Sequence, residues 1–345
     1  MQSPKYPHTP SAGSCRQFDY PRIVTNHSVN PRLSMPKYQV VESIHIDAPV
    51  ERVFQTVLDF GTWARWSPWL ISDPQANVTV SSNASSVGSR YAWRGTVTGE
   101  GEIVHEKVEP YRLIEDRLEF IKPFASTSKV VWELSPSANG TQLTWSMDGA
   151  LPWFLFLLVP TMKTFLGMDF RRGLTMLKDW IETGSIPSRC VVHGIESLDP
   201  MQMAGIVGTA AVDRVGTAME KTLEEAVREF RRQGLSMDGP VVSVYTRFRV
   251  AEKRFEFISG YVLPPGSTVE PLSPLKRWIL PSKKAFRVEH IGSYRHLGNG
   301  WSVANQLARH QKLRQCTQGT FEIYRNSPQE VPEDALRTDI YLLVK

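Results

Sequence analysis

The stretch that decides the fold of this chain lies at its C-terminal end and reads Phe321-Glu-Ile-Tyr-Arg-Asn-Ser-Pro328, followed by Thr338-Asp-Ile-Tyr-Leu-Leu-Val-Lys345. Residues 321–325 have the composition of a short strand, which Asn326-Ser-Pro328 ends, and residues 338–344 predict a second strand after a proline-rich acidic loop. Because side chains alternate along a strand, Glu322 and Tyr324 share one face of the first strand.

The position of Glu322 allows two interpretations. If both faces of the sheet are covered, the carboxylate lies in an apolar pocket beside tyrosines, and such a pocket favours a cation, a hydrogen-bond donor or a proton. Alternatively, Glu322 lies on the wet face of an antiparallel sheet, which is the usual place for a strand glutamate.

Composition limits the class of protein. A chain of 345 residues favours two domains, and 41% hydrophobic with 22% charged residues is typical of a globular protein with a core. The net charge of +5 is spread along the chain, so nucleic-acid binding is not expected. Cys15, Cys190 and Cys316 lie far apart, without metal spacing, and their odd number argues against a disulfide framework. A reducing, cytoplasmic location is expected.

Targeting segments are not expected either. The N-terminus has no apolar core of a secretory signal, and the apolar run 150–160 is shorter than the roughly 20 residues that span a bilayer. Residues 1–35 are rich in proline and lack an apolar period, which predicts a disordered tail and leaves Met35 as an alternative initiator.

A first folded unit is predicted over residues 36–184. Residues 38–46 alternate as a strand, Pro49 opens a helix with an apolar stripe, and Trp63, Trp66 and Trp69 follow in a predicted loop. A helix over 161–183, ending at Gly184, closes the unit. The intervening strands are predicted at 77–80, 90–96, 102–108, 112–120, 126–134 and 141–147.

Several motifs in this unit resemble the START-like or SRPBCC superfamily, in its polyketide cyclase and lipid-transport branch. They are Ile46-Asp-Ala-Pro49 before Val53-Phe54, Asp59-Phe60 before the tryptophans, Tyr91-Ala-Trp93-Arg-Gly95, Glu109-Pro110, and Gly140-Thr-Gln-Leu-Thr-Trp145. The resemblance implies the helix-grip fold, in which a curved antiparallel sheet wraps a long C-terminal helix around an apolar cavity. Trp63, Trp66 and Trp93 either line that cavity or pack in the core, which is the commoner place for tryptophan.

An internal repeat is predicted over residues 190–345. One copy has a strand at 190–198, a helix at 212–233 and paired strands at 240–250 and 255–262, and the other has these elements at 285–294, 300–314, 319–325 and 338–344. Pro240-Val-Val-Ser-Val-Tyr245 aligns with Gly319-Thr-Phe-Glu-Ile-Tyr324, so Ser243 is the counterpart of Glu322. This pseudo-two-fold repeat leaves a groove with a carboxylate on one side, and the whole chain is predicted to be α+β.

This half resembles the GyrI-like effector-binding domains of AraC- and MerR-type regulators, through His290-Ile-Gly-Ser-Tyr294, Phe321-Glu-Ile-Tyr324, Asn326-Ser-Pro328 and Thr338-Asp-Ile-Tyr341. The resemblance implies that Glu322 is the central pocket residue and that aromatic side chains stack on flat cationic ligands. The expected aromatic ligand contacts are Tyr245, Tyr294, Trp301, Tyr324 and Tyr341.

Three functions follow from these resemblances. The first is a small-molecule binder, either a sensor or a sequestering protein, for hydrophobic or cationic aromatic ligands, with one cavity in each domain. The second is a hydrolase of reactive small molecules, in which Glu322 is the base and Tyr294 assists. The third is an interaction module that docks on a partner protein. No helix-turn-helix precedes the effector-binding unit, so direct DNA reading is not expected, and neither a metal nor a cofactor is predicted.

Overall fold

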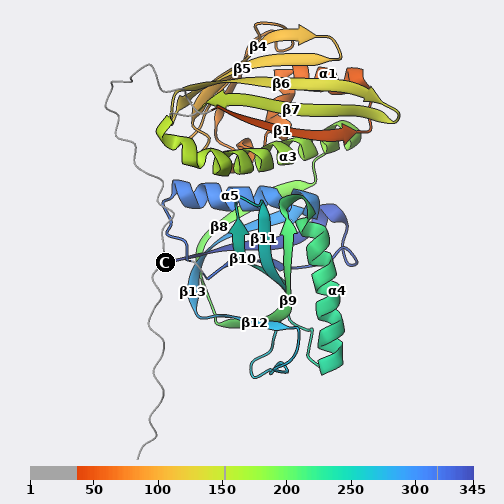
Figure 1. Ribbon diagram of the computed structural model, residues 1–345, viewed down its shortest axis with the longest axis vertical. Coiled ribbons are helices and arrows are strands. Elements are labelled where there is room, and N and C mark those ends of the chain that lie inside the picture. Colours follow the sequence, from red (N-terminus) through yellow and green to blue (C-terminus); the bar gives the residue numbers. More distant parts are fainter. Residues whose placement is uncertain (1–36, 151–152, 317) are drawn as a thin grey trace, which may run out of the picture.

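Two antiparallel sheets with their helices make up the computed structural model, which describes residues 37–150, 153–316 and 318–345 (Figure 1). The tail predicted over residues 1–35, including Met35, lies outside the described residues. Figure 1 shows the two sheets on opposite sides of a pair of helices, α3 (Val159–Thr183) and α5 (Leu297–His310).

The first sheet has seven strands in the order β1-β7-β6-β5-β4-β3-β2. Its last strand leads through η2 into α3, which packs along β1, as the helix-grip prediction requires. The elements before η2 are β1 (Lys37–Ile46), α1 (Val50–Leu58), α2 (Phe60–Trp66), η1 (Leu70–Ser72), β2 (Asn77–Val80), β3 (Arg90–Arg94), β4 (Glu100–Glu109), β5 (Leu113–Lys122), β6 (Ser126–Ser137) and β7 (Gly140–Ala150), and η2 covers Trp153–Leu158.

The segment predicted as a tryptophan-rich loop is partly helical, which corrects the prediction. Trp63 and Trp66 lie in α2, a helix of seven residues. The Asp59 side chain caps this helix by accepting a hydrogen bond from the Gly61 amide at 2.8 Å. The cap satisfies one of the free amides at the helix N-terminus, and the helical spacing turns both indole rings inward.

Aromatic rings fill the space between the first sheet and α3. Trp132 on β6 stacks on Trp145 on β7 with 4.3 Å between ring centroids, and Trp145 stacks on Phe170 of α3 at 3.9 Å. Trp66 meets the edges of Trp132 and Trp145 at 6.0 and 6.4 Å. These ring contacts pack the sheet against the helix and form the centre of the hydrophobic core.

The second sheet has eight strands in the order β12-β9-β11-β10-β14-β15-β13-β8. The half β9-β11-β10 is repeated as β13-β15-β14, which confirms the pseudo-two-fold repeat. Its elements are β8 (Ser188–Leu198), β9 (Met201–Ala211), η3 (Val212–Arg214), α4 (Val215–Gln233), β10 (Val241–Arg249), β11 (Arg254–Val262), β12 (Lys276–Leu280), β13 (Lys283–Gly292), η4 (Tyr294–His296), α5, β14 (Thr320–Tyr324), η5 (Glu333–Ala335) and β15 (Arg337–Val344).

Two strands of this sheet, β9 and β12, were not predicted, and β8 belongs elsewhere than expected. The strand predicted at 190–198 was assigned to the first copy, but β8 pairs with β13 of the second copy, whereas β12 pairs with β9. Leu280 faces Met201 and Lys283 faces Leu198, so the two bent ribbons β8–β9 and β12–β13 run antiparallel and link the ends of the sheet. The sheet therefore curls, as Figure 1 shows.

The two halves of the chain meet through polar side chains of α3. Arg172 donates to the Asn299 side-chain oxygen at 2.9 Å and to the Ser302 hydroxyl at 3.0 Å, both on α5. Asp179 accepts from Arg295 Nε at 2.8 Å and lies 2.7 Å from His296 Nε2. α3 therefore packs on its own sheet with one face and on the second half with another.

Candidate functional site

Glu322 lies in the middle of the second sheet and is fully buried. It stands on β14 directly opposite Ser243 of β10, so the two counterparts of the repeat meet across the centre of the sheet. Phe321 points to the opposite face and stacks on Tyr341 with 4.8 Å between centroids. Both faces of β14 are covered, which agrees with the buried interpretation of Glu322 and not with a wet face.

Three side chains donate hydrogen bonds to the Glu322 carboxylate. The Tyr324 and Tyr245 hydroxyls lie 2.5 and 3.2 Å from Oε1, and Trp301 Nε1 lies 2.8 Å from Oε2. The donors come from β14, β10 and α5, so they converge from both copies of the repeat. A carboxylate has about four acceptor positions, which leaves further capacity on Oε2.

Burial controls the protonation of this cluster. It raises the pKa of the Glu322 carboxyl above that of an ordinary glutamate, and the three donors offset part of that rise. Burial and the neighbouring carboxylate raise the pKa of Tyr245 and of Tyr324 well above the usual range. Both phenols therefore stay protonated at neutral pH and remain donors to Glu322.

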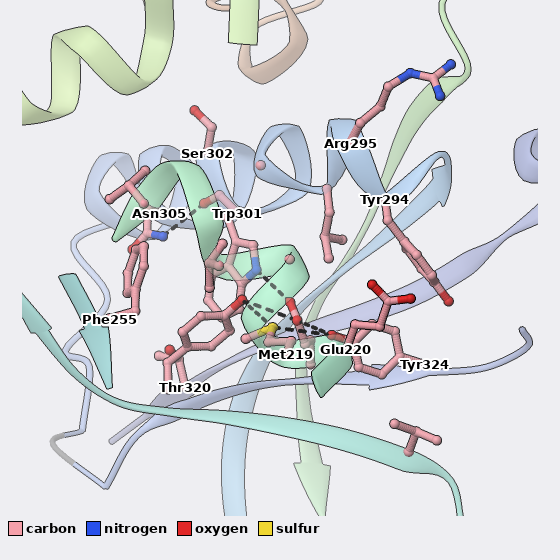
Figure 2. A pocket seen from close by; sticks show the side chains of 18 of the residues that line it. Met219, Glu220, Phe255, Tyr294, Arg295, Trp301, Ser302, Asn305, Thr320 and Tyr324 are labelled. Carbon is pink, nitrogen blue, oxygen red and sulfur yellow. Dashed lines mark hydrogen bonds between the residues drawn. The ribbon is translucent and has the colours of Figure 1, made fainter. Parts of the chain in front are cut away.

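Aromatic rings lie around the carboxylate, and Figure 2 shows three of them, Tyr294, Trp301 and Tyr324, on the wall of the pocket. Tyr245 meets Trp301 edge to face at 4.9 Å, and Tyr324 meets Tyr294 in the same way at 5.5 Å. Tyr294 donates to the Asn326 carbonyl at 3.3 Å, and burial raises its pKa to about 12. Four rings and one carboxylate form what we call the Glu322 cage.

The cage borders a cavity of about 1980 Å³. The carboxylate itself has no exposed surface because its three donors lie around it, so a ligand in this arrangement meets the rings first. Met219 of α4 adds a sulfur atom 3.8 Å from the hydroxyls of Tyr245 and Tyr324. Two exposed carboxylates of α4, Glu220 and Glu224, also line the cavity.

The structure brings four of the five predicted aromatic contacts together around Glu322, namely Tyr245, Tyr294, Trp301 and Tyr324. Tyr341 lies elsewhere: it faces the core on the other side of the sheet, where Arg325 donates to its hydroxyl at 3.0 Å. The physical reason is the register, since Tyr341 pairs with Phe321 and shares its face.

The three tryptophans predicted for the first cavity occupy the core of the first half or its edge. Trp63 and Trp66 are buried, and Trp63 donates to the Val57 carbonyl at 2.8 Å. Trp93 is half-buried, and its ring lies over Gly101, where a Cβ atom would come within 2.5 Å of the indole. Their contacts are those of packed side chains.

Sequence reasoning did not find the cavity residues Met219, Glu220 and Phe165. Met219 and Glu220 belong to a helix whose pattern fits an ordinary half-exposed helix, and Phe165 lies in the other half of the chain. No pattern within a single segment marks them.

Each half of the chain matches a protein-family model. Residues 37–182 match the family described as polyketide cyclase / dehydrase and lipid transport, and residues 193–345 match the GyrI-like small molecule binding domain. The chain is a tandem of these two domain families. Both resemblances inferred from the sequence are thereby confirmed, and the Glu322 cage lies in the GyrI-like domain.

Solved structures that match part of the chain include a protein from Mesorhizobium loti, at 16% identity over 43% of this chain and 100% of that chain, with a TM-score of 0.35. The Aha1 dimer from Colwellia psychrerythraea matches at 17% identity over 43% and 99%, with a TM-score of 0.33. EcmrR in a complex with DNA matches at 13% identity over 55% and 69%, with a TM-score of 0.37. No curated protein matches the chain.

Among the residues that the structure describes, no three His, Cys, Asp or Glu side chains are grouped so that they could hold a metal ion. None of the helices in this described part of the chain has the length and apolar character needed to cross a membrane.

Proposed function

We propose that this protein binds small aromatic cations in the Glu322 cage, as a sensor or a sequestering protein. One observation carries the proposal: a fully buried carboxylate stands behind four aromatic rings that border a large cavity. Aromatic rings attract cations through their faces, and this attraction is stronger where the cation is desolvated.

The hydrogen bonds of the cage strengthen this preference. Tyr245 and Tyr324 point their hydroxyl protons at Glu322, and a donor bound to an ionised carboxylate is polarised by it. The negative charge is thereby shared with the rings that a ligand touches.

The geometry favours binding over hydrolysis. A general base has to come within hydrogen-bond reach of the proton that it removes. Here the carboxylate has no exposed surface and already accepts from three donors, and Tyr294 is bonded to the Asn326 carbonyl instead of to Glu322. A ligand therefore meets the cage without contacting the base directly.

The proposal is tested by calorimetric titration of the full chain with benzyltrimethylammonium and with neopentylbenzene, its uncharged isostere. The cation should bind at least about tenfold more tightly, a difference of about 1.4 kcal/mol. Equal affinities would show that the cage selects shape and not charge. Incubating the protein with an aryl ester and assaying for its products tests the hydrolase alternative.

A further inference from the structure

α3 presents a second face toward the GyrI-like domain. Phe165, Met168, Arg172 and Thr175 recur at intervals of three or four residues, so they lie along one side of the helix. All four line the cavity that the Glu322 cage borders. The buried residues Phe170, Leu174 and Leu177 lie on the side that packs on the first sheet, so the cavity face is a separate one.

The C-terminal half of α3 is tied to the helix that carries the cage tryptophan. Arg172 is bonded to Asn299 and Ser302, which flank Trp301 along α5. Two turns further on, Asp179 binds Arg295 and His296, which directly follow Tyr294 in the chain. These bonds fix the position of α3 relative to the cage.

The N-terminal half of α3 reaches the other wall of the cavity. Phe165 contacts Phe248 of β10 with 6.1 Å between ring centroids. Phe248 stacks on Phe255 at 4.4 Å, and Phe255 meets Tyr245 of the cage at 5.4 Å. These rings form what we call the aromatic row, which runs from α3 to the carboxylate.

We propose that the first domain supplies the outer half of the ligand site, and that the ligand is an elongated cation. Its charged aromatic end lies at the Glu322 cage, and its apolar arm lies along Phe255, Phe248, Phe165 and Met168. This inference rests on the proposed function, because it takes the cage as the site of the charged end.

Two observations favour such a ligand. The cavity of about 1980 Å³ exceeds the roughly 300–1,000 Å³ of a drug-sized pocket, so one aromatic head does not fill it. Phe165 is 41% exposed beside the cavity, where apolar surface is still open to a partner. An apolar arm that starts at the cage meets this surface, whereas a compact cation does not reach it.

The experiment uses two probes with the same head, benzyltrimethylammonium and benzyldimethyloctylammonium, titrated into the full chain below the aggregation limit of the longer one. The parent should prefer the octyl compound by more than tenfold. In the double variant Phe165→Ala with Met168→Ala, this preference should fall about tenfold, while the affinity for the short probe changes less than about twofold. Phe156→Ala, at an exposed phenylalanine of η2 that does not line the cavity, should keep the parental preference.

The outcomes separate the two proposals. If the parent binds the short probe but shows no preference for the octyl compound, or if the double variant keeps the full preference, the two-domain site is refuted and the cage stands. If the parent does not bind the short probe, the proposed function fails, and the inference fails with it. The thermal unfolding midpoint of each variant shows that a changed preference does not come from unfolding.

Discussion

Replacing Glu322 with glutamine is the sharpest test of the charge in the cage, because the cluster can accommodate the new side chain. Trp301 Nε1 only donates, so the amide oxygen has to take the place of Oε2. The amide nitrogen then faces Tyr245 and Tyr324, whose hydroxyls can accept from it. Met219 and Ser243 lie within reach of these hydroxyls as alternative acceptors.

The expected loss of affinity follows from Coulomb's law. At an effective dielectric constant of about 20, a ligand cation about 5 Å from the carboxylate gains about 3 kcal/mol. Desolvation of the cation offsets part of this gain, and a charged hydrogen-bonded contact is worth about 1.5–3 kcal/mol net. Glu322→Gln should therefore weaken benzyltrimethylammonium binding about ten- to a hundredfold. Neopentylbenzene should lose less than about threefold, because the rings remain.

Calorimetric titration of both ligands into parent and variant gives the four affinities. Glu225→Gln is the matched control, since it removes the same charge from an exposed position of α4 that does not line the cavity. If Glu322→Gln binds the cation as tightly as the parent, or loses the neutral isostere equally, the charge of Glu322 does not act on the ligand. The reasoning would also be refuted if Glu225→Gln produced the same loss.

Three further predictions concern protonation and domain structure. Trp301→Phe removes one donor from the ionised carboxylate, so the pKa of Glu322 should rise further and the acid loss of cation binding should move to higher pH, measured by titration across a pH series. Burial lowers the pKa of His290 from 6.5 to about 4, so the unfolded chain binds a proton between these pH values more readily than the folded chain does. The free energy of unfolding should therefore have its full value above pH 6.5 and fall by about 3 kcal/mol toward pH 4. Denaturant unfolding of His290→Gln should show a smaller fall in the free energy of unfolding between pH 6.5 and pH 4, whereas the exposed control His310→Gln should show the parental fall. An unchanged fall in His290→Gln would contradict the role given to His290. The fragments 36–186 and 187–345 should each unfold cooperatively, at lower temperatures than in the full chain because Asp179 loses Arg295 and His296; calorimetry without a transition in either fragment would contradict two separately folding domains.

Local pattern was sufficient for most elements but not for β9 and β12. β9 contains glycine and alanine where a strand usually carries large β-branched side chains, so its composition does not predict a strand. Gly205 is required there, because a Cβ atom would stand 2.3 Å from the Ser259 carbonyl oxygen on β11. The reason for this residue lies in a neighbouring strand about 50 positions away, which periodicity does not reveal.

The face on which a site residue lies could be predicted when it depends on alternation within one strand. It could not be predicted when it depends on how two strands pair. Glu322 and Tyr324 share a face by alternation alone, and the tyrosine does donate to the carboxylate. The place of Tyr341 depends on how β15 pairs with β14, and a shift of one residue in that register would move its ring to the other face. The face on which Tyr245 lies also depends on strand register. Its alignment with Tyr324 in the internal repeat nevertheless predicted that the two tyrosines occupy equivalent positions.

The contacts between the two domains could not be predicted from the sequence of α3 alone. Asp169, Arg172 and Asp179 interrupt the apolar pattern of α3, and polar residues on one side of a helix normally indicate solvent. In the structure Arg172 instead meets Asn299, which lies 127 residues further along the chain. The partner of a charged side chain is known only from the three-dimensional structure. Periodicity indicates which side of a helix is apolar, but it does not indicate what covers the polar side. The cavity face of α3, and with it the link between the two domains, therefore had to come from the three-dimensional structure.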